Sequence, residues 1–399
     1  MPTIAGLRGT GDWGVDERPK NYRETILFLE PNGMAPLQAL LGKMGSEPTD
    51  DPEFAWWEEK LTHQRVKATA AAAAALTTLT LAEGGALMFV EGDLIIVETA
   101  GGLWANEIVR VSQDPTTDTS LKVTRGAAGT TAADIAAGTY LTKIGNAFAE
   151  GTLSPTATTR NPVKLKNFTQ IFKTTYSITG TAAVTKSRTG PVLEKDKKRK
   201  LFDIMRDMEM ACIYGGASET TGANNKPLRT TGGLLSFITT NRVQFGDGSN
   251  GTVEITEDNI IDFFSQVFNY DGMGAGNERL AFMGNVALTK LNKIARASTN
   301  TRITFDGSIK VYGMELQKWV LPQGTIYFKT HPLFNVHPEL TKAVMLINPK
   351  GIKERPLRKL KFTDNTQPNN ADYKEGEWLT ETGFEFNHEE TMAFAGGLA

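Results

Sequence analysis

Residues 68–147 constrain the fold of this 399-residue chain most, because short apolar runs alternate there with close, regular turns. The turns are rich in glycine and aspartate, as in Glu83-Gly84-Gly85 and Gln113-Asp114-Pro115. Such spacing is typical of a small β-barrel or sandwich. Extended sequence precedes the block at 54–66 and resumes at 163–178, so we predict a β-domain inserted at the tip of a long β-excursion. The predicted strands are 77–81, 94–97, 104–111 and 120–124.

The clearest helix is predicted over residues 191–214, opened by Gly190-Pro191 and ended by Gly215-Gly216. Its apolar residues form one stripe: Leu201, Ile204, Met205, Met208, Ala211 and Cys212. Further helices are predicted at 36–44, at 256–270 with Thr256 as the cap, and at 285–297. Strands are predicted at 280–283, 302–305, 309–320, 325–328 and 343–347. A basic hinge at 353–361 and an acidic strand at 377–389 follow.

Charge is segregated along the chain although the total is nearly neutral, with 43 basic and 45 acidic residues. Residues 1–60 have a net charge of −5, residues 151–200 of +9, and residues 364–399 of −7. A nearly neutral total charge argues against a protein whose whole surface binds a polyanion such as nucleic acid. The basic centre therefore has two candidate partners, nucleic acid or the acidic segments of neighbouring copies, and neutrality within one chain type favours the copies.

Motifs that carry chemistry are weak in this sequence. Residues 246–251 match a dinucleotide fingerprint in form, but strand-like sequence on both sides favours a hairpin turn. The single cysteine, Cys212, excludes a disulfide framework and is interpreted as a core thiol. His331 and His337 are interpreted as loop packing, and Trp56-Trp57 as subunit packing. We expect no catalytic, cofactor or metal site, no targeting signal and no membrane span.

Several motifs, in their order along nearly the whole chain, resemble one family of virus proteins. The motifs are Arg8-Gly9-Thr10-Gly11-Asp12-Trp13, Pro31-Asn32-Gly33, Asp51-Pro52-Glu53-Phe54-Ala55-Trp56-Trp57, Gly126-Ala127-Ala128-Gly129-Thr130-Thr131, Asn167-Phe168-Thr169-Gln170-Ile171-Phe172 and Ser177-Ile178-Thr179-Gly180-Thr181. This order resembles the major head (capsid) proteins of tailed bacteriophages with the Hong Kong 97-type, or Johnson, fold. Within that family it looks most like the N-four-like podovirus heads.

The resemblance implies an α+β fold with four named parts. Residues 1–49 would be the N-arm and the start of the P-domain, and residues 50–67 and 146–180 the strands of the E-loop. Residues 68–145 would be the inserted β-barrel or sandwich, and 181–217 the P-domain spine helix. Residues 218–349 would be the A-domain, and 350–399 the return to the P-domain with the C-terminus. No lysine–asparagine cross-link is expected.

The resemblance also implies the function. Copies would assemble as hexamers and pentamers into an icosahedral head that encloses double-stranded DNA, within the cytoplasm of a bacterial host. Portal and scaffolding proteins are implied partners, as is a decoration protein unless the insert replaces it. An encapsulin-like shell and a β-rich tail or adhesin component are the alternatives, and an enzyme is not expected. The subunit interface is predicted to use Trp56, Trp57, Lys195, Lys197, Lys198, Arg199, Lys200, Glu377, Glu381 and Glu385.

Overall fold

The computed structural model describes residues 46–59, 64–98, 106–157, 159, 161–187, 190–270, 277–297, 306–311 and 314–399. The predictions for the helix at 36–44, the strand at 302–305 and most of the N-arm at 1–49 lie outside these residues. The chain divides into two compact units, one formed by residues 57–164 and one by residues 1–56 with 165–399. Strands β1 (Glu53–Glu58) and β8 (Val163–Phe168) pair with each other.

The unit of residues 57–164 is an antiparallel six-stranded sheet in the order β2-β7-β4-β5-β6-β3. A bridge between Ala68 and Leu81 joins the two outermost strands, so the sheet curls back on itself. Alternate residues of each strand point inward because side chains in a strand alternate between faces. The inward residues include Ile95, Val109 and Leu141, which pack into one apolar core. The strands are β2 (Arg65–Lys67), β3 (Thr78–Thr80), β4 (Asp93–Glu98), β5 (Ile108–Val111), β6 (Ser120–Ala127) and β7 (Tyr140–Asn146).

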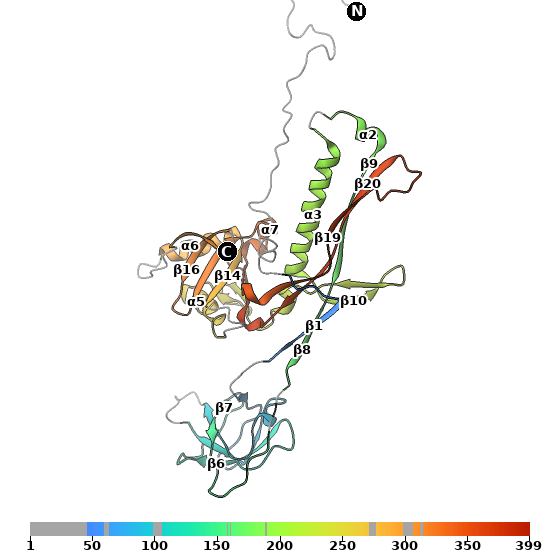
Figure 1. The fold of residues 1–399 in the computed structure, drawn as a ribbon. Helices are drawn as coiled ribbons and strands as arrows, with labels where there is room; N and C mark the ends of the chain where they lie inside the picture. Colours follow the sequence, from blue (N-terminus) through green and yellow to red (C-terminus); the bar gives the residue numbers. More distant parts are fainter. Residues whose placement is uncertain are drawn as a thin grey trace, which may run out of the picture. The chain divides into compact units, whose positions relative to one another are not determined.

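The other unit contains a long helix against a three-stranded sheet (Figure 1). Helix α3 (Val192–Tyr214) packs along the antiparallel strands β9 (Gln170–Thr179), β20 (Tyr373–Phe386) and β19 (Ile352–Asp364). Ile204 and Met208, from the predicted apolar stripe, pack against Phe172 of β9 and Trp378 of β20. The stripe thus faces the sheet, which confirms the predicted helix and its buried side.

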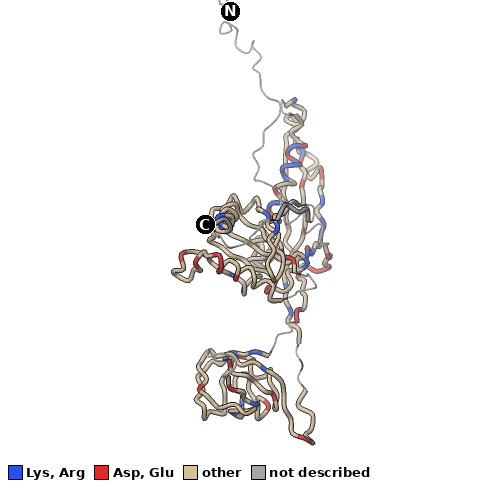
Figure 2. The backbone as a smooth tube through the Cα atoms, turned by 90° about the vertical axis from the view of Figure 1, so that its left-hand side faces the viewer, with Lys and Arg blue, Asp and Glu red and all other residues tan. Residues whose placement is uncertain are grey.

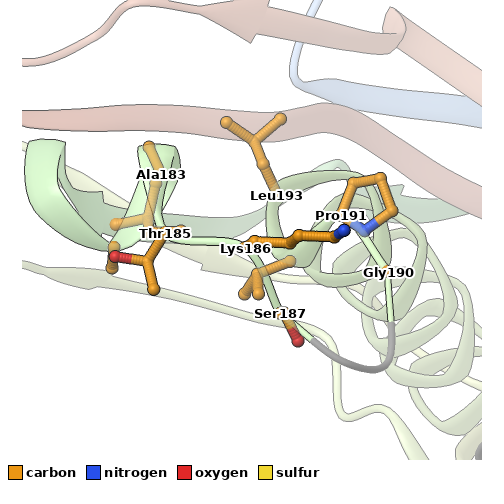
Figure 3. Close-up of a pocket in the computed structure, with 10 residues that line it drawn as sticks. Ala183, Thr185, Lys186, Ser187, Gly190, Pro191 and Leu193 are labelled. Carbon is orange, nitrogen blue, oxygen red and sulfur yellow. The ribbon is translucent and has the colours of Figure 1, made fainter. Parts of the chain in front are cut away.

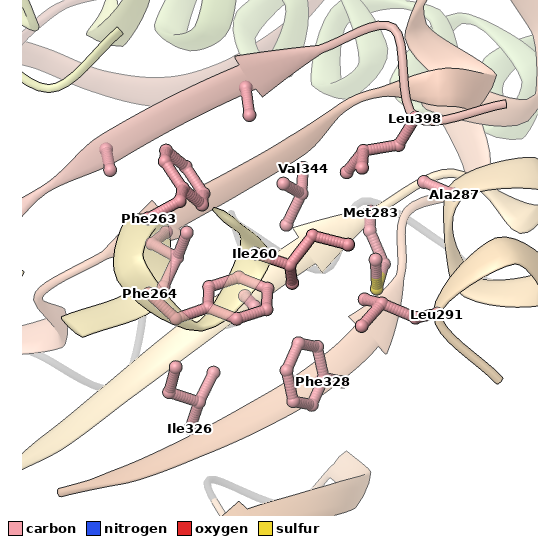
Figure 4. Packing of buried hydrophobic residues seen from close by; sticks show 14 of the residues in the cluster. Ile260, Phe263, Phe264, Met283, Ala287, Leu291, Ile326, Phe328, Val344 and Leu398 are labelled. Atoms are coloured by element: carbon pink, nitrogen blue, oxygen red, sulfur yellow. The ribbon is translucent and has the colours of Figure 1, made fainter. Parts of the chain in front are cut away.

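An eight-stranded mixed sheet forms the rest of this unit, in the order β13-β12-β21-β18-β14-β17-β16-β15. Helices α5 (Glu257–Gln266) and α6 (Asn285–Ala297) pack on one face, where Phe263 and Phe264 lie over Ile326 and Phe328 (Figure 4). Thr256 caps α5 as predicted, since its side chain accepts a hydrogen bond from Asn259 N–H. The strands are β12 (Arg242–Gly246), β13 (Val253–Glu254), β14 (Glu278–Met283), β15 (Asp306–Val311), β16 (Met314–Val320), β17 (Thr325–Thr330), β18 (Val344–Ile347) and β21 (Ala393–Gly396).

The opposite face of the eight-stranded sheet contacts the end of α3. Cys212 and Ile213 of α3 pack there with Leu280, Phe282 and Met345, which alternate along their strands with residues of the first face. The short helices α4 (Leu234–Phe237) and α7 (Pro332–Val336) complete this core. The remaining elements are the short helix α2 (Gly180–Val184) and a hairpin of β10 (Ser218–Thr221) and β11 (Pro227–Thr230).

Four sequence predictions are wrong in detail. Strands β12 and β13 run parallel, so residues 247–252 form a connecting loop and not a hairpin turn. The single strand predicted at 309–320 is the hairpin of β15 and β16, in which Val311 pairs with Met314. The basic hinge at 353–361 is part of β19, because its backbone pairs with β20, with two irregular shifts in register. Strand β21 lies inside the eight-stranded sheet, together with the strands of residues 218–349. The predicted boundary at 349 had assigned it to the return to the P-domain.

Candidate functional site

Five cations crowd the first half of α3, at Lys195, Lys197, Lys198, Arg199 and Lys200 (Figure 2). The partial positive charge at the N-terminus of a helix acts mainly within the first turn, and Lys197, Lys198, Arg199 and Lys200 lie beyond that turn. Glu194 is the only acidic residue in the first turn of α3. The five cations are close together on one stretch of the helix, where like charges three or four residues apart repel one another.

Lys197 contacts the sheet of its own chain. Its ammonium lies 3.5 Å from the centre of the Phe362 ring, a cation–π contact. The indole N–H of Trp378 donates a hydrogen bond of 3.2 Å to the carbonyl oxygen of Lys197. Lys197 therefore fastens α3 to strands β19 and β20, a structural role that the sequence did not reveal.

The other four cations are exposed or half-exposed. Arg199 lies 3.6 Å from Asp196, and Lys200 lies 3.6 Å from Asp203, both beyond hydrogen-bond distance. The side chains of these two ion pairs are between 32 % and 52 % exposed. Within the described part of the chain, Lys195 and Lys198 have no carboxylate within ion-pair distance. Exposed cations of this kind contribute little to the stability of one chain and remain available to a partner.

The three predicted carboxylates of the C-terminal segment are instead paired inside the chain. Glu377 binds Lys173 at 2.8 Å, and the buried Glu381 binds Arg358 at 2.6 Å. The buried Glu385 binds Arg355 and accepts a hydrogen bond from the amide of Asn387. All three pairs join neighbouring strands of the β9-β20-β19 sheet. Their charges are therefore already neutralised without a neighbouring copy.

The two tryptophans of β1 differ in exposure because adjacent residues of a strand face opposite ways. Trp56 is buried and packs beside Phe54 and Phe237. Trp57 has 64 % of its surface exposed. A large exposed indole is the kind of side chain that anchors protein–protein contacts. Of this pair, only Trp57 is placed to meet another molecule.

A buried pair joins α3 to the eight-stranded sheet. His331 Nε2 lies 2.7 Å from Glu209 Oε1, and both side chains are fully buried. His331 Nδ1 accepts a hydrogen bond from Leu333 N–H and so caps α7. Cys212, one turn along from Glu209, is also buried, and burial raises the pKa of its thiol well above the usual value. Cys212 therefore has the core role that we predicted, whereas His331, interpreted from the sequence as loop packing, joins α7 to α3 across the core.

No group of three or more metal-ligating side chains occurs among the described residues. The same residues include no helix that is both long and apolar enough to span a membrane.

Glu354 of β19 supplies a pH-dependent prediction. Burial raises the pKa of its carboxyl, an effect only partly offset by the hydrogen bond of 3.0 Å from the Thr382 hydroxyl. The folded state therefore binds the Glu354 proton more tightly than the unfolded chain does. At neutral pH, the charged form of Glu354 lowers the stability of the folded state. We expect Glu354→Gln to raise the Tm at pH 7 by about 2 °C, and the gain to vanish as the pH falls below the carboxyl's ordinary pKa.

Glu389→Gln is the matched control, measured by thermal unfolding of the unassembled chain at several pH values. Burial of Glu389 acts to raise its pKa, but donors from Thr239 and Thr240 outweigh burial and lower it. Its charged form therefore stabilises the fold above the unfolded pKa, and we expect Glu389→Gln to lower the Tm at pH 7. Equal Tm shifts of the same sign for both variants would contradict the role given to Glu354.

Comparison with known proteins gives the family. The family model described as SU10 major capsid protein matches residues 3–399. A protein named major capsid protein, from Pseudomonas phage PaMx41, is 28 % identical over 336 residues, covering 84 % of this chain and 78 % of its own length. Among solved structures, the capsid of the native GTA particle aligns over 96 % of both chains with a TM-score of 0.45 and 9 % identity. The capsid of Myoviridae phage XM1 aligns over 95 % of this chain and 96 % of its own, with a TM-score of 0.42 and 10 % identity. The match over residues 3–399 shows that the chain belongs to the SU10 major capsid protein family.

Proposed function

We propose that this protein is the subunit of a phage head, and that its copies assemble as hexamers and pentamers into an icosahedral shell around double-stranded DNA. The observation that carries the proposal is the family match over nearly the whole chain. The narrower likeness to N-four-like podovirus heads stays a prediction.

The proposed assignment of parts follows the Hong Kong 97-type plan. Helix α3 with the β9-β20-β19 sheet would be the P-domain, and the eight-stranded sheet with α5 and α6 the A-domain. Because β21 belongs to the eight-stranded sheet, the A-domain would include residues 393–396 as well as 218–349. Strands β1 and β8 would belong to the E-loop, and the curled sheet of residues 65–146 would be the insert within it.

Lys195, Lys198, Arg199 and Trp57 are proposed as the residues that contact neighbouring subunits. The support is that these cations are exposed or half-exposed, while Trp57 presents a large apolar surface. Glu377, Glu381 and Glu385 are not proposed as their anionic partners, since each has a partner in its own chain. The anions would come from another part of a neighbouring copy, from a scaffolding protein or from DNA phosphates.

The experiment that tests the function is expression of the full chain, alone and with its scaffolding and portal genes, followed by electron microscopy. Closed shells or capsomers of five and six copies are expected. A chain that remains monomeric at high concentration in both settings would contradict the proposal. Shells that enclose only protein, when portal and packaging genes are present, would favour the encapsulin-like alternative.

Charge reversal tests the proposed contacts. We expect Lys195→Glu, Lys198→Glu and Arg199→Glu together to lower the yield of shells at least tenfold, because like charges at an interface repel. The fold should survive, since these side chains lie at the surface. The yield is measured by sedimentation of assembled particles.

The control has the same change in net charge at exposed lysines elsewhere: Lys122→Glu, Lys226→Glu and Lys293→Glu. Normal shells are expected from it. Normal shells from the first triple variant would show that the α3 cations do not contribute to assembly.

A further inference from the structure

A hollow of about 350 Å³ lies where β9 ends, between α2 and the start of α3. Figure 3 shows Ala183 and Thr185 on one side of it and Pro191 and Leu193 on the other, with Lys186 and Ser187 between them. The lining is mostly apolar, and Ile178, Ala182 and Val192 complete it. A hollow of this size is large enough to admit an aliphatic side chain.

The short helix α2 beside the hollow is firmly held. Its first turn is capped by the Thr179 side chain, which accepts a hydrogen bond from Ala182 N–H. At its other end, both the amide and the hydroxyl of Thr185 donate to the carbonyl of Thr181, at 3.0 and 2.7 Å. Gly180 N–H donates to the carbonyl of Asp372 in the turn between β19 and β20. The last residue of α2 is therefore presented in a defined direction.

That last residue is Val184, and 88 % of its surface is exposed. Val192, on the rim of the hollow, is 37 % exposed. A valine at the end of a capped helix, next to an apolar hollow that it does not fill, is an unpartnered protrusion. The same end of the molecule thus carries both a protruding apolar side chain and an apolar hollow.

Charges of both signs flank these features. Lys186 and Lys195 lie on the side of α2 and α3, whereas Asp364, which accepts a hydrogen bond from the Tyr176 hydroxyl, ends β19 and Asp372 directly precedes β20. The close approach of Asp372 to Gly180 sets the acidic turn directly against α2. A second copy, rotated about an axis near this end, would bring its cations to these carboxylates. Such a contact between two different patches of the same chain closes into a ring when it is repeated by rotation.

We propose that Val184 of one copy enters the hollow between α2 and α3 of the next copy, with the flanking charges pairing across the contact. The inference rests on the proposed capsid function and specifies one of its interfaces. The occupant is a second copy because the hollow, the protrusion and both charge signs occur together on one end of one chain.

The first test is Val184→Asp, which places a charge in an apolar hollow. We expect at least a tenfold lower yield of sedimenting shells, with an unchanged Tm of the unassembled chain because Val184 is exposed. Val336→Asp is the matched control, since Val336 of α7 is 68 % exposed and lies away from the hollow, and its shells should form normally. If Val184→Asp gives as many shells as the wild type, the inference is overturned and the proposed function stands. If the wild-type chain itself forms no shells, the proposed function is contradicted.

The second test is cross-linking between two single variants, Val184→Cys and Val192→Cys, co-assembled into one particle and treated with diamide. The native Cys212 is buried, so it does not compete. A covalent dimer on a non-reducing gel is expected from the mixture and not from either variant alone. Assembled mixed particles that yield no dimer would overturn the inference.

Discussion

Deletion of residues 393–399 is expected to abolish folding of the eight-stranded sheet. Strand β21 lies inside that sheet, with β12 parallel on one side and β18 antiparallel on the other. Ala393, Ala395 and Leu398 are buried in the core beneath α5 and α6, and Leu398 N–H donates to the carbonyl of Lys342. The deletion removes two strand pairings and part of the core, a loss of more than about 5 kcal/mol and comparable to the whole stability of a domain.

The measurement is thermal and urea unfolding of the unassembled chain, with solubility as a second readout. The graded control is Leu398→Ala, which should cost about 2–4 kcal/mol by leaving a cavity while keeping the strand. A deleted chain that still unfolds cooperatively near the wild-type midpoint would contradict the placement of β21. Exposed edges of β12 and β18 should also make the deleted chain aggregate.

Substitution of Glu209 by alanine is expected to destabilise the chain by about 2–4 kcal/mol. Since His331 Nδ1 accepts the Leu333 N–H, the proton of a neutral imidazole lies on Nε2, which donates to Glu209. The alanine leaves this buried donor without its acceptor and opens a cavity between α3 and the sheet. Glu209→Gln keeps an acceptor oxygen and should cost about 1 kcal/mol.

A double-mutant cycle with His331→Phe isolates the pair from the cap that His331 also provides to α7. Unfolding free energies are needed for Glu209→Ala, His331→Phe and the double variant. We expect the double variant to be clearly less destabilised than the sum of the two single variants. Additive effects would show that the short distance between Glu209 and His331 carries no coupling.

The elements most accessible to sequence reasoning were those whose signal is local. Helix α3 was predictable because its apolar stripe repeats with the helical period and its ends carry Pro191 and Gly215. Helix α6 was predicted with its exact bounds for the same reason. The direction of β13 was not predictable, since a glycine-rich loop such as 247–252 can reverse the chain or continue it, and the choice depends on which strands already lie beside it.

The candidate interface also has a part that the sequence reveals and a part that only the tertiary structure reveals. The cations of α3 could be found by counting charge along the sequence. Their separate roles could not, because Phe362, which Lys197 covers, is distant in sequence and lies on a different strand. The partners of Glu381 and Glu385 likewise depend on the register of β19 against β20, which contains two irregular shifts.

The sequence by itself determined the α+β class, the long helix with its buried side, a β-rich segment between two extended ones, and the family to which the motifs point. These properties follow from periodicity, turn residues and motif order, which are local in the chain. Only the tertiary structure decided which charges are neutralised inside one subunit, which of two adjacent tryptophans is exposed, and that the last strand lies within the larger sheet. These three properties are set by strand register and by packing between segments that are distant in sequence. Pairing and burial depend on which distant segments the fold brings together, and not on the neighbours of a residue in the sequence.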